Sequence, residues 1–101
     1  MTVSSTSSKD IAFLGFDGCP NTPELRKRLM EAEPNADICD VDLMALQSGD
    51  PRLGWGAPTI LVHGKDLFGV PANKNGSVSC RNWNNGLPSV NDIQRAFKDL
   101  P

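Results

Sequence analysis

The hydrophobic positions along the chain form short segments of different periodicity. Residues 11–16 and 59–62 are nearly continuous apolar runs, which are typical of strands buried on both faces. Residues 36–43 alternate between apolar and polar positions, and this alternation predicts a strand at the edge of a sheet. Cys39 lies on the apolar side of that strand, so we expect it to be a buried, inert core residue.

Two other segments have the periodicity of an amphipathic helix. The first is expected to begin near Thr22 as N-cap, with Pro23 at the first helical position, and to end at Pro34. Its apolar face consists of Leu25, Leu29 and Ala32. The second begins at Ser89, with Asp92 three residues later as in a capping box. Its apolar face consists of Val90, Ile93, Phe97 and Leu100.

The connections complete the predicted order of elements. Residues 59–62 and 67–68 are expected to pair as a hairpin around a tight turn at 63–64. Residues 71–88 form a long Asn- and Gly-rich connection with a short extended piece at 78–81. A strand–helix–strand unit has parallel strands, whereas the strands of a hairpin are antiparallel. The chain is therefore predicted to be an α/β domain with a mixed sheet.

Composition and charge limit the classes of partner. A length of 101 residues indicates one domain, assigned to residues 11–101, after a Ser/Thr-rich tail at 1–10 that we expect to be disordered. The net charge of −2 favours neither nucleic acid nor an anionic membrane as a partner, and no apolar run is long enough to cross a bilayer. The tail lacks the features of a secretion signal, so we expect a cytoplasmic protein. We also expect it to be a monomer or a weak dimer.

The three cysteines are the candidates for chemistry. Their wide spacing is a poor disulfide framework and, with His63, a poor zinc-binding pattern, so no metal site is predicted. Cys19 lies in a turn before the first helix, whose N-terminus stabilises a thiolate, and the Thr22 hydroxyl is a further donor. Asp17 opposes thiolate formation. The alternative is that Cys19 is a small apolar residue filling the turn.

The order of elements and two local features resemble the thioredoxin-like fold. Cys19 lies where that family places its redox cysteine, and Ala57-Pro58-Thr59 lies where it places a cis-proline facing that cysteine. The segments FDGCPNTPELR, GAPTILVHGKDLFG and SCRNWNNGLPS look like parts of small bacterial thioredoxin-like proteins. The resemblance implies a central mixed four-stranded sheet, with helices on both faces, and a cis bond before Pro58.

The sequence departs from the family at one position. The usual Cys-x-x-Cys motif is Cys-x-x-Thr here, with Thr22 in place of the second cysteine, which resembles monothiol glutaredoxin-like variants. The resemblance places the connection carrying Cys80 near the first helix, so Cys80 is a candidate resolving thiol. Alternatively, Cys80 anchors its own segment under Trp83.

The resemblance also implies a substrate groove beside Cys19. The backbone of Ala57 is expected to be exposed and to pair with a bound peptide or glutathione. The expected substrate-binding residues are Trp55, Ala57, Pro58 and Thr59, although Trp55 has an equally good interpretation as a core residue.

These observations predict thiol–disulfide exchange, in which Cys19 is the redox-active thiol and Cys80 or glutathione resolves the mixed disulfide. The partner is a thiol or disulfide of a protein or of glutathione, and no cofactor is required. One alternative is a non-catalytic binding module that contacts a protein through the Pro58 groove. Another is capture of a thiophilic metal or an organomercurial by Cys19 and Cys80.

Overall fold

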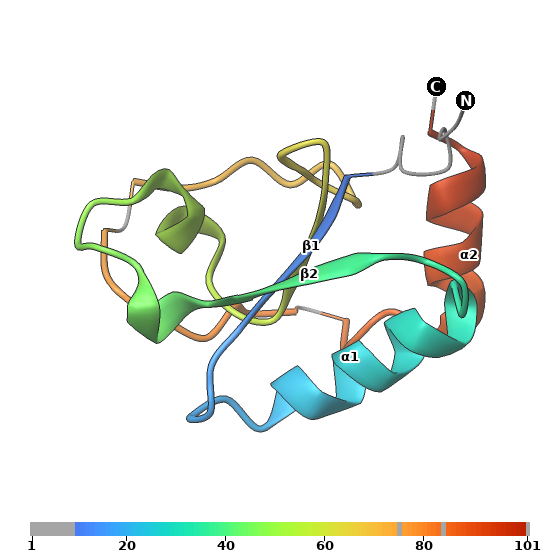
Figure 1. The fold of residues 1–101 in the computed structure, drawn as a ribbon, viewed down its shortest axis with the longest axis horizontal. Helices are drawn as coiled ribbons and strands as arrows, with labels where there is room; N and C mark the ends of the chain where they lie inside the picture. Colours follow the sequence, from blue (N-terminus) through green and yellow to red (C-terminus); the bar gives the residue numbers. More distant parts are fainter. Residues whose placement is uncertain (1–9, 75, 84, 101) are drawn as a thin grey trace.

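The computed structural model describes residues 10–74, 76–83 and 85–100. Of the tail predicted over residues 1–10, only Asp10 is among the described residues. The elements in chain order (Figure 1) are β1 (Ile11–Gly15), α1 (Asn21–Ala32), β2 (Ile38–Asp42), the 3₁₀ helices η2 (Leu43–Ala45) and η3 (Pro51–Trp55), β3 (Thr59–Val62), β4 (Lys65–Asp66) and α2 (Val90–Lys98).

The four strands form one mixed sheet in the order β2-β1-β3-β4. β2 is parallel to β1, whereas β3 is antiparallel to both β1 and β4. The mixed sheet, the edge position of β2 and the hairpin around His63 and Gly64 are therefore confirmed. The second hairpin strand begins earlier than predicted, at Lys65, although Leu67 N–H still donates to Ile60 C=O at 2.9 Å.

The two faces of the sheet are covered differently. Ile11 and Phe13 of β1 face a core formed with both α-helices, whose buried members there are Leu25, Leu29, Ala32, Ile93 and Phe97. In Figure 1 α1 and α2 accordingly adjoin at the lower right. The predicted arrangement with helices on both faces is wrong for the α-helices. Leu14 and Leu61 on the opposite face pack against Leu43 of η2 and Leu53 of η3.

The sequence of residues 43–56 explains this difference. Gly49, Pro51, Gly54 and Gly56 interrupt it, and both residue types are poor in the interior of an α-helix. The segment therefore forms only two short 3₁₀ helices, which satisfy backbone groups in single turns. The second face of the sheet is covered by a thin layer rather than by a helix.

The start of α2 agrees with the prediction from the sequence, whereas the start of α1 does not. The Ser89–Asp92 capping box at the start of α2 is confirmed, with Asp92 N–H donating to Ser89 Oγ at 3.0 Å. The start of α1 is corrected, because Pro20 is its N-cap and no side chain among the described residues caps it. Thr22 is thus inside the first turn of α1 instead of preceding it.

Cys39 is exposed, which corrects the prediction that it is a core residue. It lies in β2 on the same side as Val41, and Val41 packs against the cluster beneath η2 and η3. β2 is an edge strand, and the two short 3₁₀ helices on that face leave Cys39 exposed. Alternation in the sequence identifies the face of a strand but does not show how far that face is covered.

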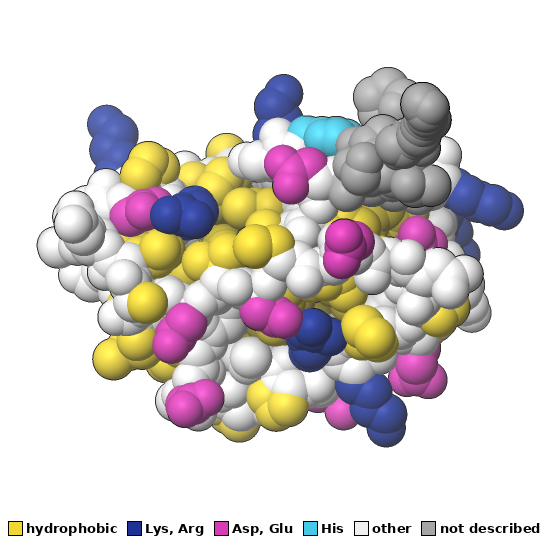
Figure 2. Space-filling model, in the orientation of Figure 1, with side chains coloured by type: hydrophobic (Ala, Val, Ile, Leu, Met, Phe, Trp, Pro, Cys, Tyr) yellow, Lys and Arg dark blue, Asp and Glu magenta, His cyan; other side chains and the backbone are white. Residues whose placement is uncertain are grey.

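Acidic, basic and hydrophobic side chains are interspersed on the face that Figure 2 shows. Within the part of the chain that the structure describes, no helix has the length and apolar character needed to span a membrane.

Candidate functional site

Cys19 lies in the turn between β1 and α1 and is only 2% exposed. Its N–H donates to Phe16 C=O at 3.2 Å, and its own carbonyl accepts from Thr22 N–H at 3.1 Å. These two bonds hold the residue against the end of the sheet. Its thiol donates to the carbonyl oxygen of Ala57, with an Sγ–O distance of 3.4 Å.

The bond between Ala57 and Pro58 is cis, as the sequence analysis predicts. Ala57 immediately precedes the cis-proline and β3, and its carbonyl is the group that accepts from Cys19. The structure therefore brings the predicted cysteine and the predicted cis-proline together, although 38 residues of sequence separate Cys19 from Ala57.

The backbone of Ala57 is not exposed. Its N–H donates to Ser79 C=O at 2.9 Å, and its C=O accepts from Arg81 N–H at 2.7 Å. Ala57 and Cys80 thus form a parallel β-bridge. We refer to residues 79–81 as the strap. Because the strap occupies both backbone groups of Ala57, the prediction that this edge is open to a peptide is wrong for this structure.

Gly56 allows the strap to come this close. A Cβ atom at position 56 would lie 3.0 Å from Ser79 O and 3.1 Å from Arg81 N, and the residue has a positive φ of 73°. Both features favour glycine, because a side chain would push the strap away and would strain the backbone. The neighbouring residues Ala57, Pro58 and Thr59, predicted to bind substrate, are all buried.

The strap is fixed by Arg81. Its guanidinium forms a bidentate ion pair with Asp66, at 2.6 and 3.3 Å, and the two side chains are 8% and 0% exposed. It also donates to Thr59 Oγ1 at 3.1 Å and lies 3.8 Å from the centre of the Trp83 ring. Trp83 Nε1–H in turn donates to Pro58 C=O at 3.2 Å. These contacts link the strap to β3 and β4.

Cys80 is consequently held beside Cys19, which is the juxtaposition that the sequence analysis allows. A hydrogen bond with the Cys19 side chain raises the pKa of the Cys80 thiol, and partial desolvation and the negative charge that Cys19 can carry add to the effect. Both residues are free thiols, but Cys19 is buried whereas Cys80 is exposed. The two thiols therefore lie side by side but differ greatly in their access to solvent.

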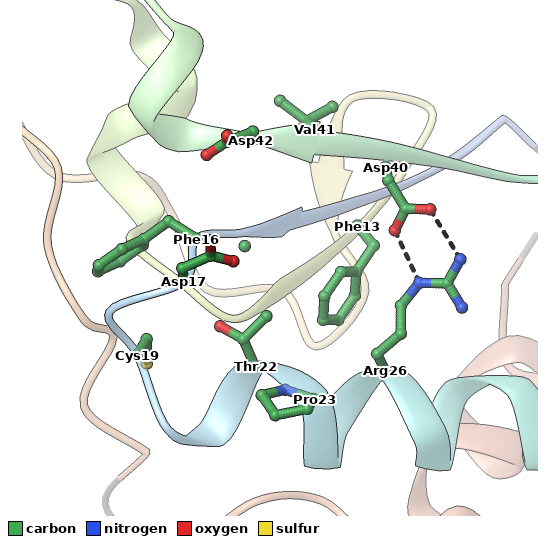
Figure 3. A pocket seen from close by; sticks show the side chains of 11 residues that line it. Phe13, Phe16, Asp17, Cys19, Thr22, Pro23, Arg26, Asp40, Val41 and Asp42 are labelled. Atoms are coloured by element: carbon green, nitrogen blue, oxygen red, sulfur yellow. Dashed lines mark hydrogen bonds and ion pairs between the residues drawn. The ribbon is translucent and has the colours of Figure 1, made fainter.

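A pocket of about 470 Å³ opens on the other side of Cys19 (Figure 3). Phe13 and Phe16 provide its aromatic lining, and Arg26 pairs with Asp40 through two bonds of 2.7 Å at its end. The hydrogen bonds from Arg26 lower the pKa of Asp40, so this carboxylate stays ionised. Since Asp17 and Asp42 also line the pocket, acidic groups outnumber basic ones there.

Two predicted roles are corrected in this region. Among the described residues, the Thr22 hydroxyl has no hydrogen-bond partner, so it does not donate to Cys19, whose sulfur faces Ala57 instead. Trp55 packs against the core cluster beneath η3, and its Nε1–H donates to Val70 C=O at 2.7 Å. Trp55 is thus half-buried against this cluster, which agrees with its alternative interpretation as a core residue.

The start of α1 also offers fewer donors than a typical helix N-terminus. Pro20 and Pro23 carry no N–H, and the N–H of Thr22 is already bonded to Cys19 C=O. Few backbone donors at the start of α1 are therefore free to bond the Cys19 sulfur, and its thiol donates to Ala57 C=O instead.

Sequence reasoning did not identify Arg81 and Asp66, which position Cys80. Arginine and aspartate side chains are rarely buried unless they are paired, but the sequence does not show which arginine pairs with which aspartate.

The described residues contain no group of three or more His, Cys, Asp or Glu side chains arranged to hold a metal ion. Comparisons with protein-family models, curated proteins and solved structures found no match to this chain.

Proposed function

We propose that this protein performs thiol–disulfide exchange with Cys19 and Cys80 as its redox pair. The proposal rests on one observation: Ala57 pairs with the strap through its backbone and accepts a hydrogen bond from the Cys19 thiol. Cys80 is thereby fixed beside Cys19, and proximity of this kind is what disulfide formation requires. The element order and the cis-proline beside Cys19 support a thioredoxin-like architecture for the domain.

The chemistry is a two-electron exchange. The two thiols form a disulfide while an external disulfide is reduced to two thiols, which take up the two protons that Cys19 and Cys80 lose. Cys80 thus replaces the second motif cysteine that is absent at Thr22. The external partner is a thiol or disulfide of a protein or of a small molecule.

The charge around the pocket refines the choice of small molecule. Asp17 and Asp42 remain after Arg26 and Asp40 have neutralised one another, so the lining carries excess negative charge. Glutathione is an anion at neutral pH and is repelled by such a site. A disulfide that enters this pocket should therefore be neutral or cationic rather than glutathione.

Equilibration in buffers of reduced and oxidised dithiothreitol tests this proposal. As the buffer becomes more oxidising, the wild-type chain should lose two thiols in one step and keep the third. Cys39→Ser is the matched control, because it removes an exposed thiol of β2 that is not part of the proposed pair, and it should still lose two. Cys19→Ser and Cys80→Ser should lose none. Three thiols retained by the wild type under fully oxidising conditions would contradict the proposal.

The same juxtaposition supports a second candidate function, capture of a soft cation. Two adjacent thiolates suit a two-coordinate thiophilic ion such as Cu(I) or Hg(II). A Cys39→Ser chain should then bind one Hg(II) ion tightly, and adding Cys80→Ser should abolish tight binding. Tight binding that survives the loss of Cys80 contradicts a two-thiol site.

A further inference from the structure

The two thiols of the proposed pair differ in access to solvent. Cys19 is 2% exposed and its thiol is directed at the carbonyl of Ala57, whereas Cys80 is exposed on the strap. Exchange requires the attacking sulfur to lie in line with the S–S bond of the external disulfide, so the rate depends on access to the attacking sulfur as well as on its acidity. The first contact with an external disulfide is therefore easier at Cys80.

The strap also covers the approach to Cys19 from the side of Ala57. An external chain can pair with Ala57 only after Ser79 and Arg81 release its N–H and C=O. Release of Arg81 would separate it from Asp66, whose side chain is fully buried, and leaving a buried carboxylate without its partner is costly. Undocking of the strap is therefore costly, which favours exchange with the strap in place.

We propose that Cys80 is the thiol that attacks external disulfides and that Cys19 is the internal resolving thiol. The assignment rests on the proposed function and reverses the order of attack expected from the sequence. The Cys80 thiolate attacks one sulfur of R–S–S–R, forms a Cys80 mixed disulfide and releases one R–S⁻, which is protonated. Cys19 then loses its proton, attacks Cys80 Sγ and releases the second R–S⁻, leaving the Cys19–Cys80 disulfide.

The small neutral probe bis(2-hydroxyethyl) disulfide tests the order of attack in a Cys39→Ser background. With Cys19→Ser added, Cys80 should form a mixed disulfide about tenfold or more faster than Cys19 does in the Cys80→Ser chain, because access limits exchange. Serine is close in size to cysteine, so neither substitution opens the packing around the remaining thiol. Mass spectrometry of proteolytic peptides locates the adduct.

A second measurement uses the unaltered chain and so does not depend on folding of the variants. A short pulse of iodoacetamide on the reduced protein should label Cys39 first, Cys80 next because its pKa is raised, and Cys19 last. Labelling of Cys19 as fast as or faster than Cys80 would overturn the inference.

Failure of this inference can be distinguished from failure of the proposed function. Faster formation of the mixed disulfide on Cys19 than on Cys80 would overturn the order of attack while leaving two-thiol exchange in place. An equal, slow reaction at both sites, with no disulfide in dithiothreitol buffers, would overturn both.

Discussion

Substitution of Arg81 by alanine should destabilise the domain strongly. Arg81→Ala removes both ion-pair contacts to Asp66, whose side chain is fully buried, and it removes the contacts to Thr59 and the Trp83 ring. Breaking a buried pair by removing one partner costs about 3–5 kcal/mol. Asp66 keeps hydrogen bonds from Phe68 N–H and Val70 N–H, at 3.1 and 3.0 Å, which places the expected loss near the lower limit.

A loss of about 3 kcal/mol is large relative to the roughly 5–15 kcal/mol by which domains of this size are stabilised. Urea unfolding at neutral pH under reducing conditions measures it. Arg95→Ala is the matched control, because Arg95 and Asp92 are 4.0 Å apart with side chains 72% and 51% exposed. An exposed pair of this kind contributes about 0–1 kcal/mol.

A double substitution separates the buried charge from the packing. Arg81→Met combined with Asp66→Asn removes both charges and keeps similar volumes, so it should be more stable than Arg81→Met alone, which leaves Asp66 unpaired. The reasoning is refuted if Arg81→Ala costs no more than Arg95→Ala, or if the double variant is less stable than Arg81→Met.

Three further predictions concern the thiol pair and the core. Cys19→Ala should lower the pKa of Cys80, because it removes the hydrogen bond and the charge that raise that pKa. Iodoacetamide should then label Cys80 faster at pH 8 than in the wild-type chain. An unchanged labelling rate would contradict the contact between the two thiols. Leu25→Ala should cost about 2–5 kcal/mol in urea unfolding, since Leu25 is fully buried, while Met30→Ala on the exposed side of α1 should cost far less. Gly54→Ala should cost about 1–3 kcal/mol, because the added Cβ would overlap the backbone oxygen of Asn73. A variant as stable as the wild type argues against this packing.

The features that could be predicted from sequence are those with a local signal. The apolar faces of α1 and α2, the buried strand β3 and the Ser89 capping box all follow from periodicity or from a short motif. The resemblance to the thioredoxin-like fold supplied two long-range relations, the cis bond before Pro58 and the proximity of Cys80 to Cys19.

The features that could not be predicted depend on contacts between distant segments. Nothing in the Asn- and Gly-rich sequence of residues 71–88 indicates that Ser79 and Arg81 would bond to Ala57. The pairing of Arg81 with Asp66 likewise has no periodicity and no motif. The exposure of Cys39 depends on how far the layer above β2 extends, and alternation along one strand carries no information about that layer.

The most direct test of the central claim is a peptide map of the reduced protein after mild, limiting oxidation. Digestion without reduction, followed by mass spectrometry, identifies which cysteines are joined. We predict that peptides containing Cys19 and Cys80 are linked within one chain, while Cys39 stays reduced. Linkage of Cys39 to either residue, or oxidation that leaves Cys19 and Cys80 unlinked, would contradict the account.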